Sequence, residues 1–373
     1  MFQLCIIAKI ILSIYTKSIS VKKQFFILPI VLLSSVLGIW SGLQRIGWNL
    51  PLNNYSGFHG SLMVGSFLGT LICLERTITN SNKKFLILPF VCSLSFLFFI
   101  IRQPEISYLI LLLSGIGLCY IYFKLYLQFN EVYLLIMLCG ALCWSIGNVI
   151  LIKTSFYPQA VTWWIAFLFF TVSAERIELS RYLQLSNTRK VILLILLAVF
   201  IIGIFVPFHE AGGFIIAFSF IGTSIWLLVN DMASRSIMKE GQHRYSGILL
   251  LTGYVWLAVS GLFMGYGAYW GLLYDATLHT FFLGFVFSMI FAHAPIILPG
   301  VLGIPIKPFN RYLYIWFYLL QITLILRVTG ILIVDTSLKQ IGGLLNGISI
   351  LGFFVNIIYL TKQKEYLINT NKT

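Results

Sequence analysis

Three histidines stand in otherwise almost entirely apolar stretches, and they are the residues best suited to chemistry. His59 lies in HGSLMVGSFLG, while His279 and His293 lie in the run from Asp275 to Gly300, DATLHTFFLGFVFSMIFAHAPIILPG. An imidazole buried in hydrocarbon needs a partner, so a histidine in such a segment indicates a functional site. On a helix, His279 and His293 would be roughly 21 Å apart along the axis, too far to share one metal ion.

The composition predicts that membrane-spanning helices carry these histidines. Of the 373 residues, 59% are hydrophobic and 10% are charged, and the mean hydropathy is +0.95. A water-soluble domain of this length does not carry so few charges, so we expect an all-α polytopic membrane protein in contact with the lipid bilayer. Because no phosphate-binding or dinucleotide-binding motif interrupts the apolar runs, any chemistry must take place within the helical bundle.

Twelve apolar runs have the length that a helix needs to cross a bilayer. They are residues 25–44, 56–75, 84–101, 106–127, 131–152, 157–176, 190–208, 212–230, 245–268, 274–298, 309–331 and 340–361. Residues 1–24 are too short and too interrupted for a span, and we interpret them as an interfacial helix or a non-native start. Residues 25–361 form the predicted membrane domain, and 362–373 form a predicted cytoplasmic tail.

The basic residues test this count, because cytoplasmic loops of membrane proteins are rich in Lys and Arg. With the N-terminus in the cytoplasm, twenty of the 25 Lys and Arg residues fall on the inner side of the twelve spans. Both termini are therefore predicted to be cytoplasmic. The formal net charge of +14 then reports topology, and it does not indicate a nucleic-acid partner.

The predicted topology places His59 and His279 at similar depth, near the outer ends of the second and tenth spans. Two neutral imidazoles facing each other across a helical bundle are the usual axial ligands of a haem iron in a membrane. We therefore predict one haem b held by His59 and His279. The alternative is that each ring is only hydrogen-bonded at the outer interface.

The helix that carries His59 is predicted to line the slot for this haem. On an ideal α-helix four small or adaptable side chains share the face of His59. These are Met63, Ser66, Thr70 and Cys73. Gly65 and Gly69 would relieve crowding nearby.

A second group of polar residues is predicted at the cytoplasmic ends of the second, sixth and tenth spans. Glu75 and Glu175, each followed by an arginine, lie there at the level of His293. The Glu-Arg pairs are interpreted as anchors of the helix ends, and the sharper hypothesis is a proton relay, or a second site, formed by Glu75, Glu175 and His293. The four-helix spacing of these spans suggests three related four-helix arcs. Glu75 lies nearly opposite His59 on an ideal α-helix, which argues against one continuous proton path there.

The remaining candidates are weaker. His209, beside Glu210 in a predicted outer loop, is expected to be solvated or to guard an entrance, and His243 is expected to be solvated in an inner loop. Cys139 and Cys143 are one helical turn apart, so they either bind a soft metal or pack as small residues. The six cysteines show no disulfide framework.

The histidine segments resemble two known families. Twelve helices with a histidine early in the second and another early in the tenth resemble the main subunit of the haem-copper oxidases, where those helices carry haem ligands. DATLHTFFLGFVFSM, and more loosely HGSLMVGSFLG, are similar to the NnrS family, bacterial membrane proteins associated with haem, copper and nitric oxide metabolism. The resemblance implies haem binding through His59 and His279.

Two differences from these families limit the activities that we expect for this protein. The sixth and seventh spans contain no histidine, whereas the oxidases bind copper there, so we do not expect dioxygen reduction. The sequence AHAPIILPG also differs from the end of the corresponding NnrS helix. Copper is therefore left open, with no residues that support it.

The leading prediction is a haem protein of the bacterial cytoplasmic membrane. It would act in electron transfer or in handling nitric oxide or another respiratory gas, with respiratory-chain proteins as partners. Whether it is an enzyme is left open, because two axial histidines leave no coordination position for a substrate. The competing hypotheses are a transporter or channel for a small polar or metal species that uses the same histidines, and a non-catalytic assembly partner of a respiratory complex.

Overall fold

The computed structural model describes residues 27–51, 53–80, 82–179, 183, 185–207, 211–267, 273–302 and 308–370. Within these ranges every regular element is helical. In chain order the elements are α3 (Ile27–Arg45), η1 (Asn53–Phe58), η2 (Ser61–Gly69), α4 (Thr70–Ile78), η3 (Lys83–Leu86), α5 (Ile87–Ile100), α6 (Pro104–Phe129), α7 (Val132–Thr154), α8 (Tyr157–Leu179), α9 (Asn187–Phe205), α10 (Gly213–Asn230), α11 (Ala233–Ser236), α12 (Gly241–Gly267), α13 (Tyr274–His279), η7 (Thr280–Val286), α14 (Phe287–Leu302), α15 (Leu313–Leu332) and α16 (Thr336–Thr370).

Twelve helical segments in the described ranges are long and apolar enough to cross a membrane. They correspond one to one, and in the same order, to the twelve predicted spans, so the prediction of an all-α polytopic membrane protein is confirmed. The second span joins η2 to α4, and the tenth joins α13, η7 and most of α14. The cytoplasmic termini and the three arcs stay predictions. Residues 1–24 lie outside the described part, and α16 continues as one helix to Thr370.

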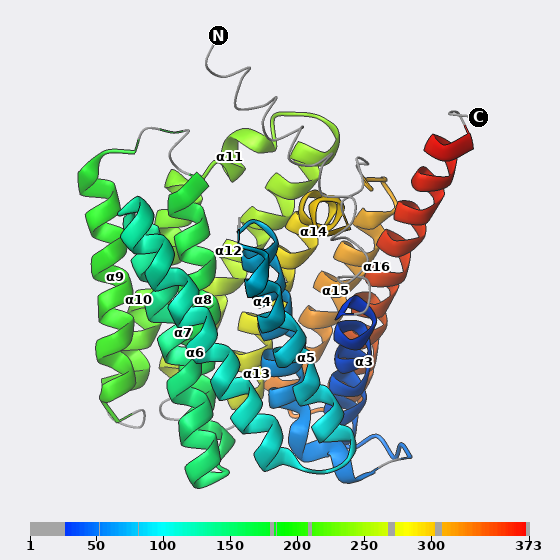
Figure 1. Cartoon of the computed structure of the whole chain (residues 1–373). Helices are drawn as coiled ribbons and strands as arrows, with labels where there is room; N and C mark the ends of the chain where they lie inside the picture. The colour runs from blue at the N-terminus through cyan, green and yellow to red at the C-terminus, as the bar shows by residue number, and fades with distance from the viewer. Residues whose placement is uncertain are drawn as a thin grey trace.

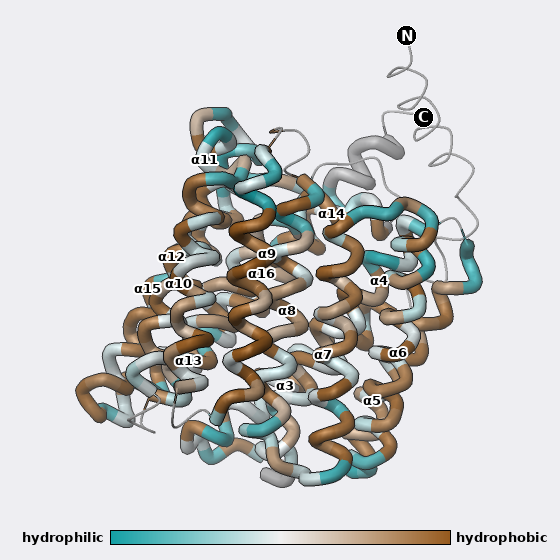
Figure 2. The backbone as a smooth tube through the Cα atoms, turned by 90° about the vertical axis from the view of Figure 1, so that its left-hand side faces the viewer, coloured by the Kyte–Doolittle hydropathy of each residue, from teal (hydrophilic) through white to brown (hydrophobic). Residues whose placement is uncertain are grey.

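The helices stand side by side with roughly parallel axes (Figure 1). Figure 2 shows apolar residues concentrated in the middle of the bundle and polar residues at its two ends. Many large apolar side chains are exposed, among them Phe205 (73%) and Val229 (69%). Hydrocarbon is the environment in which such side chains are stable, so these faces contact lipid.

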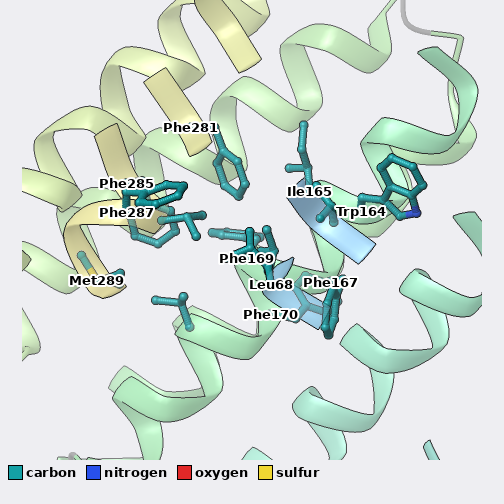
Figure 3. Packing of buried hydrophobic residues seen from close by; sticks show 14 of the residues in the cluster. Leu68, Trp164, Ile165, Phe167, Phe169, Phe170, Phe281, Phe285, Phe287 and Met289 are labelled. Carbon is teal, nitrogen blue, oxygen red and sulfur yellow. The ribbon is translucent and has the colours of Figure 1, made fainter. Parts of the chain in front are cut away.

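The centre of the bundle is formed by the second and sixth spans. Their apolar windows are 72% and 78% buried, against 28% for the seventh span. Aromatic side chains pack α8 against its neighbours. The ring centre of Phe169 lies 5.1 Å from that of Phe200 on α9 and 5.0 Å from that of Phe220 on α10. The ring centre of Phe220 lies in turn 5.4 Å from that of Phe281 on η7. Figure 3 shows Phe169 and Phe281 close together in this cluster. The cluster fixes η7, and therefore the helix that carries His279.

π-helical segments interrupt the second and tenth spans. η2 (Ser61–Gly69) follows His59, and η7 (Thr280–Val286) directly follows His279. A π-helix closes its hydrogen bonds five residues apart, so each turn holds more residues than an α-turn, and such segments are frequent at functional sites. Both histidines are therefore followed by a π-helical backbone, which the sequence did not predict.

Close helix packing around the second span depends on glycine. A Cβ added at Gly69 would lie 2.5 Å from Cζ2 of Trp144, whose ring is fully buried and stacks on Phe167 at 4.9 Å. The indole has no free space to move into, so Gly69→Ala should destabilise the protein by about 1–3 kcal/mol. Thermal unfolding of the detergent-solubilised protein measures this loss.

The matched control for this substitution is Gly300→Ala on α14. A Cβ at Gly300 meets nothing within 4 Å. Alanine is a better helix former than glycine, so this variant should be as stable as the unchanged protein or slightly more so. Equal stability of both alanine variants would contradict the packing described for Gly69.

Candidate metal centre

The structure brings His59 and His279 together. The centres of the two imidazole rings are 6.3 Å apart, and their planes differ by 23°. A metal ion bound by two imidazole nitrogens at about 2 Å, with each nitrogen about 1.1 Å from its ring centre, separates the ring centres by about 6 Å when the nitrogens lie on opposite sides. The observed separation fits this arrangement. The two rings come from spans that are more than two hundred residues apart in sequence.

Each imidazole is anchored through Nδ1. Nδ1 of His59 lies 2.7 Å from the carbonyl oxygen of Gly38 on α3, and Nδ1 of His279 lies 2.8 Å from the carbonyl oxygen of Asp275. A carbonyl only accepts hydrogen bonds, so both Nδ1 atoms carry the proton and donate. Among the described residues, no hydrogen bond reaches Nε2 of either ring. Metal-binding histidines are held in the same way, with one nitrogen donating to an oxygen and the other on the metal.

A cluster of charged side chains around Asp275 lies next to His279. The Asp275 carboxylate lies 3.0 Å from Nδ1 of His279 and accepts hydrogen bonds of 3.0 and 3.2 Å from the Arg327 guanidinium. The Lys339 ammonium is 3.5 Å from the same carboxylate. Arg327 is buried within α15, so its charge is stable there only because it is paired. The pair of Asp275 and His279 could have been suspected from their i, i+4 spacing, but their contact with Arg327 could not.

A glycine on α3 makes room for the His59 ring. A Cβ added at Gly42 would lie 2.7 Å from both Cε1 and Nδ1 of His59. Gly42 and the carbonyl of Gly38 thus form a cradle that fixes the position of this ring. Neither Gly38 nor Gly42 was predicted to be part of the site.

The predicted one-sided slot beside His59 is not formed. Met63 packs against α3, where a Cβ at Gly38 would lie 2.5 Å from its sulfur. Ser66 instead lies 2.7 Å from the Ser95 hydroxyl of α5. The prediction assumed an ideal α-helix, whereas η2 is a π-helix and turns through a smaller angle at each residue. Side chains spaced for one α-helical face are therefore spread over two.

The second predicted group is also assembled, at the other end of the bundle. Glu75, Glu175 and His293 all line one cavity of about 470 Å³. The Arg76 guanidinium donates to Glu175 at 2.8 Å and lies 3.7 Å from both Glu75 and Glu178. Arg76 of α4 is thus paired with Glu75 on its own helix and with two glutamates of α8, so these ion pairs connect the ends of the two helices. Proton relay through this group stays a prediction.

His293 is held by two partners. Its Nδ1 donates to the carbonyl oxygen of Met289 at 2.7 Å, and its Nε2 accepts a hydrogen bond of 2.9 Å from the Arg176 guanidinium. Arg176 also lies 4.0 Å from the Asp231 carboxylate, which accepts a 2.6 Å hydrogen bond from the Tyr254 hydroxyl. A metal ion at His293 would have to displace the guanidinium from Nε2.

Of the weaker candidates, His243, Cys139 and Cys143 lie in the described ranges, and neither of the two groups includes them. His243 is exposed, and His209 lies outside the described residues. Cys139 is exposed whereas Cys143 is buried, so the two thiols have different environments. In the described ranges no cluster of three or more His, Cys, Asp or Glu side chains is arranged to hold a metal ion. His59 and His279 are the histidines whose rings the described structure brings next to each other.

The ion pairs of Arg76 with Glu75, Glu175 and Glu178 should be essential for the stability of the fold. Arg76→Met would leave the Glu175 carboxylate without its 2.8 Å partner and three carboxylates close together. Removing one partner of a buried ion pair costs about 3–5 kcal/mol, and we expect the lower end because Glu178 is 37% exposed. Thermal or denaturant unfolding in detergent measures the loss.

Two further variants test the cause of that loss. Adding Glu175→Gln to Arg76→Met removes one of the uncompensated charges and should restore part of the stability. Lys153→Met, at an exposed position near the end of α7, removes a cation without a buried partner and should change stability little. If Arg76→Met unfolds no earlier than Lys153→Met, Arg76 does not hold these helices together.

Similarity to a known family extends over nearly the whole membrane-spanning part. The model of the family described as a domain of unknown function, DUF8744, matches residues 24–362. No curated protein and no solved structure matches the chain. The matched region contains eleven spans completely and all but the last residue of the twelfth. It also contains the pair His59 and His279, and Arg76 with its neighbouring glutamates. The chain is therefore a member of the DUF8744 family.

Proposed function

We propose that this protein binds one haem b between His59 and His279 and acts in electron transfer or in handling nitric oxide or another respiratory gas. The observation that carries the proposal is the pair of opposed imidazoles, with ring centres 6.3 Å apart and both Nδ1 atoms anchored to oxygens. That anchoring leaves Nε2 of each ring without a hydrogen bond from the described residues, as a metal-binding imidazole requires.

The small number of protein ligands favours haem over a bare metal ion. A structural zinc site needs four protein ligands, and two imidazoles alone are an incomplete set. A haem iron needs only the two axial ligands, because the macrocycle supplies the other four. The His279 side chain is 17% exposed, so the ring is not fully enclosed by protein atoms.

Bound haem would supply a one-electron redox centre, and the residues of this chain would set its behaviour. Asp275 fixes the tautomer and orientation of His279 and makes it a stronger ligand. Arg327 and Lys339 balance the Asp275 charge, at 3.0 and 3.5 Å. His59 is held by a single carbonyl, so its ring would be less firmly fixed than that of His279, which also contacts the Asp275 carboxylate.

Cellular context follows from the resemblance around His279. Similarity to the NnrS family supports a place in the bacterial cytoplasmic membrane and a link with respiratory-chain proteins. We do not propose copper or dioxygen reduction, because the sixth and seventh spans contain no histidine to hold copper.

Transport through the histidine pair is the less favoured function. A transporter places its substrate in a water-filled cavity near the middle of the membrane. The large cavity described here is mostly apolar and borders Glu75 and His293, at the opposite end of the spans from His59 and His279. Neither His59 nor His279 is among the residues that line that cavity.

Visible spectroscopy tests the haem directly. Protein purified in mild detergent from cells supplied with haem should show a Soret band that His59→Ala and His279→Ala each abolish or shift, because each removes an axial ligand. His243→Ala changes an exposed histidine and should leave the spectrum unchanged. Wild-type protein without a Soret band would rule out the proposal.

Chemical rescue separates a ligand from a structural histidine. In His279→Gly, added imidazole can enter the space of the missing ring and should restore the spectrum. A merely structural role would give no such spectral recovery. If the band survives in both alanine variants, the haem is bound elsewhere.

Loss of the Asp275 carboxylate should weaken the site without removing a ligand. Asp275→Asn keeps the size of the side chain but loses the charge that orients His279, and such changes typically reduce metal affinity 10–100-fold. Haem titration of the apo-protein measures the affinity. Glu105→Gln, at an exposed position, is the control. Equal haem affinity in both variants would argue against a supporting role for Asp275.

A further inference from the structure

The inner half of the bundle contains a cavity of about 470 Å³ between five helices. α3, α4, α8, α14 and α16 all contribute side chains, and the lining is mostly aliphatic. Representative residues, one from each helix, are Leu32, Leu71, Val172, Ile290 and Ile357. Binding sites for small molecules have this size and this predominantly apolar lining, with a few polar groups that fix orientation.

The cavity extends along the helices, and its charged lining residues lie toward one end. Phe67 and Glu75, both in its wall, are eight residues apart and therefore about 12 Å apart along the helix. The polar residues gather at the Glu75 end: Glu75, Glu175, His293 and Lys362. Pro29 and Lys362 are also exposed, so the cavity reaches the surface. An apolar space with one polar end fits an amphiphile.

One polar group at this end has no hydrogen-bond partner. Arg76 donates to Glu175 at 2.8 Å, and Arg176 donates to His293 at 2.9 Å. Among the described residues no hydrogen bond reaches the Glu75 carboxylate, whose nearest cation is Arg76 at 3.7 Å. A partly buried carboxylate in an apolar wall is stabilised by a hydrogen-bond donor. Glu75 therefore indicates what the head group of a ligand must supply.

The mixture of charges around Glu75 selects a neutral head group. Arg76, Arg176 and Lys362 disfavour a ligand with a fixed positive charge. Glu75 and Glu175 disfavour a phosphate or carboxylate. A neutral group is repelled by neither set of charges. It can donate a hydrogen bond to a carboxylate oxygen and accept one from a nearby N–H.

We infer that this cavity binds a membrane-soluble hydroquinone with an isoprenoid tail. One ring hydroxyl donates to the Glu75 carboxylate. The second ring oxygen remains available to the Lys362 ammonium, and the tail lies along Leu71, Val172 and Ile290 toward Phe67. Binding does not depend on the haem proposal, because the cavity and the histidine pair lie at opposite ends of the spans.

Equilibrium binding of a radiolabelled decyl hydroquinone, kept reduced, tests the inference in detergent-solubilised protein. We expect saturable binding to the wild type and an affinity about tenfold or more lower for Glu75→Gln, which loses a hydrogen bond to a charged acceptor. Leu71→Trp fills the cavity and should abolish binding. If Leu71→Trp does not fold, Ala294→Leu on α14, in the same wall, takes its place.

Matched controls lie outside the cavity. Glu105→Gln is exposed on α6, and Leu113→Trp is at a position that is 53% exposed on the same helix. Both should bind the hydroquinone as the wild type does. Unchanged affinity in Glu75→Gln together with either cavity-filling variant would overturn the assignment of this site.

Competing ligands test the chemistry of the head group. Decylamine, a lysophospholipid and geranylgeraniol supply an ammonium, a phosphate and a single hydroxyl without a ring. Each should compete at least about tenfold more weakly than unlabelled decyl hydroquinone. If any of them competes equally well, the cavity is not selective for a hydroquinone. Loss of haem from His279→Ala with hydroquinone binding intact would separate this inference from the proposed function.

Discussion

Hydrocarbon offers no hydrogen-bonding partner, and the polar organisation of this protein follows from that constraint. A charge inside the bundle is stable only where another side chain neutralises it. The protein meets this requirement in two layers. At one end of the spans, Asp275 is paired with Arg327 and Lys339, and at the opposite end Arg76 is paired with Glu175. The aromatic and aliphatic middle separates these layers, and each lies beside one of the two candidate sites.

Hydropathy and charge were sufficient to predict much of this arrangement. The lengths of the apolar runs gave all twelve spans, because crossing a bilayer imposes a minimum helix length. The direction of each span then gave depth, and depth placed His59 near His279 and Glu175 near His293 before any contact was known. These relations need only one coordinate, the height along the membrane normal, and a sequence encodes that coordinate directly.

Rotation about each helix was the coordinate that the sequence did not give. The π-helical segment after His59 moves Ser66 toward α5 while Met63 faces α3, so the prediction of one shared face was wrong. Pairing between distant spans was equally hidden: the contact of Asp275 with Arg327 joins α13 to α15, and no local spacing predicts it. Glu75 had been placed opposite His59 on an ideal helix. In the structure Glu75 lies in the wall of the cavity, which does not include the histidine pair.

The glycine beside His59 has a consequence for how related sequences would vary. Any side chain at position 42 would occupy the space of the imidazole, since even a Cβ would come within 2.7 Å of the ring. Position 42 can therefore accept a larger residue only where position 59 no longer carries a histidine in this orientation. Within the family, the two positions should change together, and a relative with Gly42 and His59 both replaced would have abandoned this half of the site while keeping the bundle.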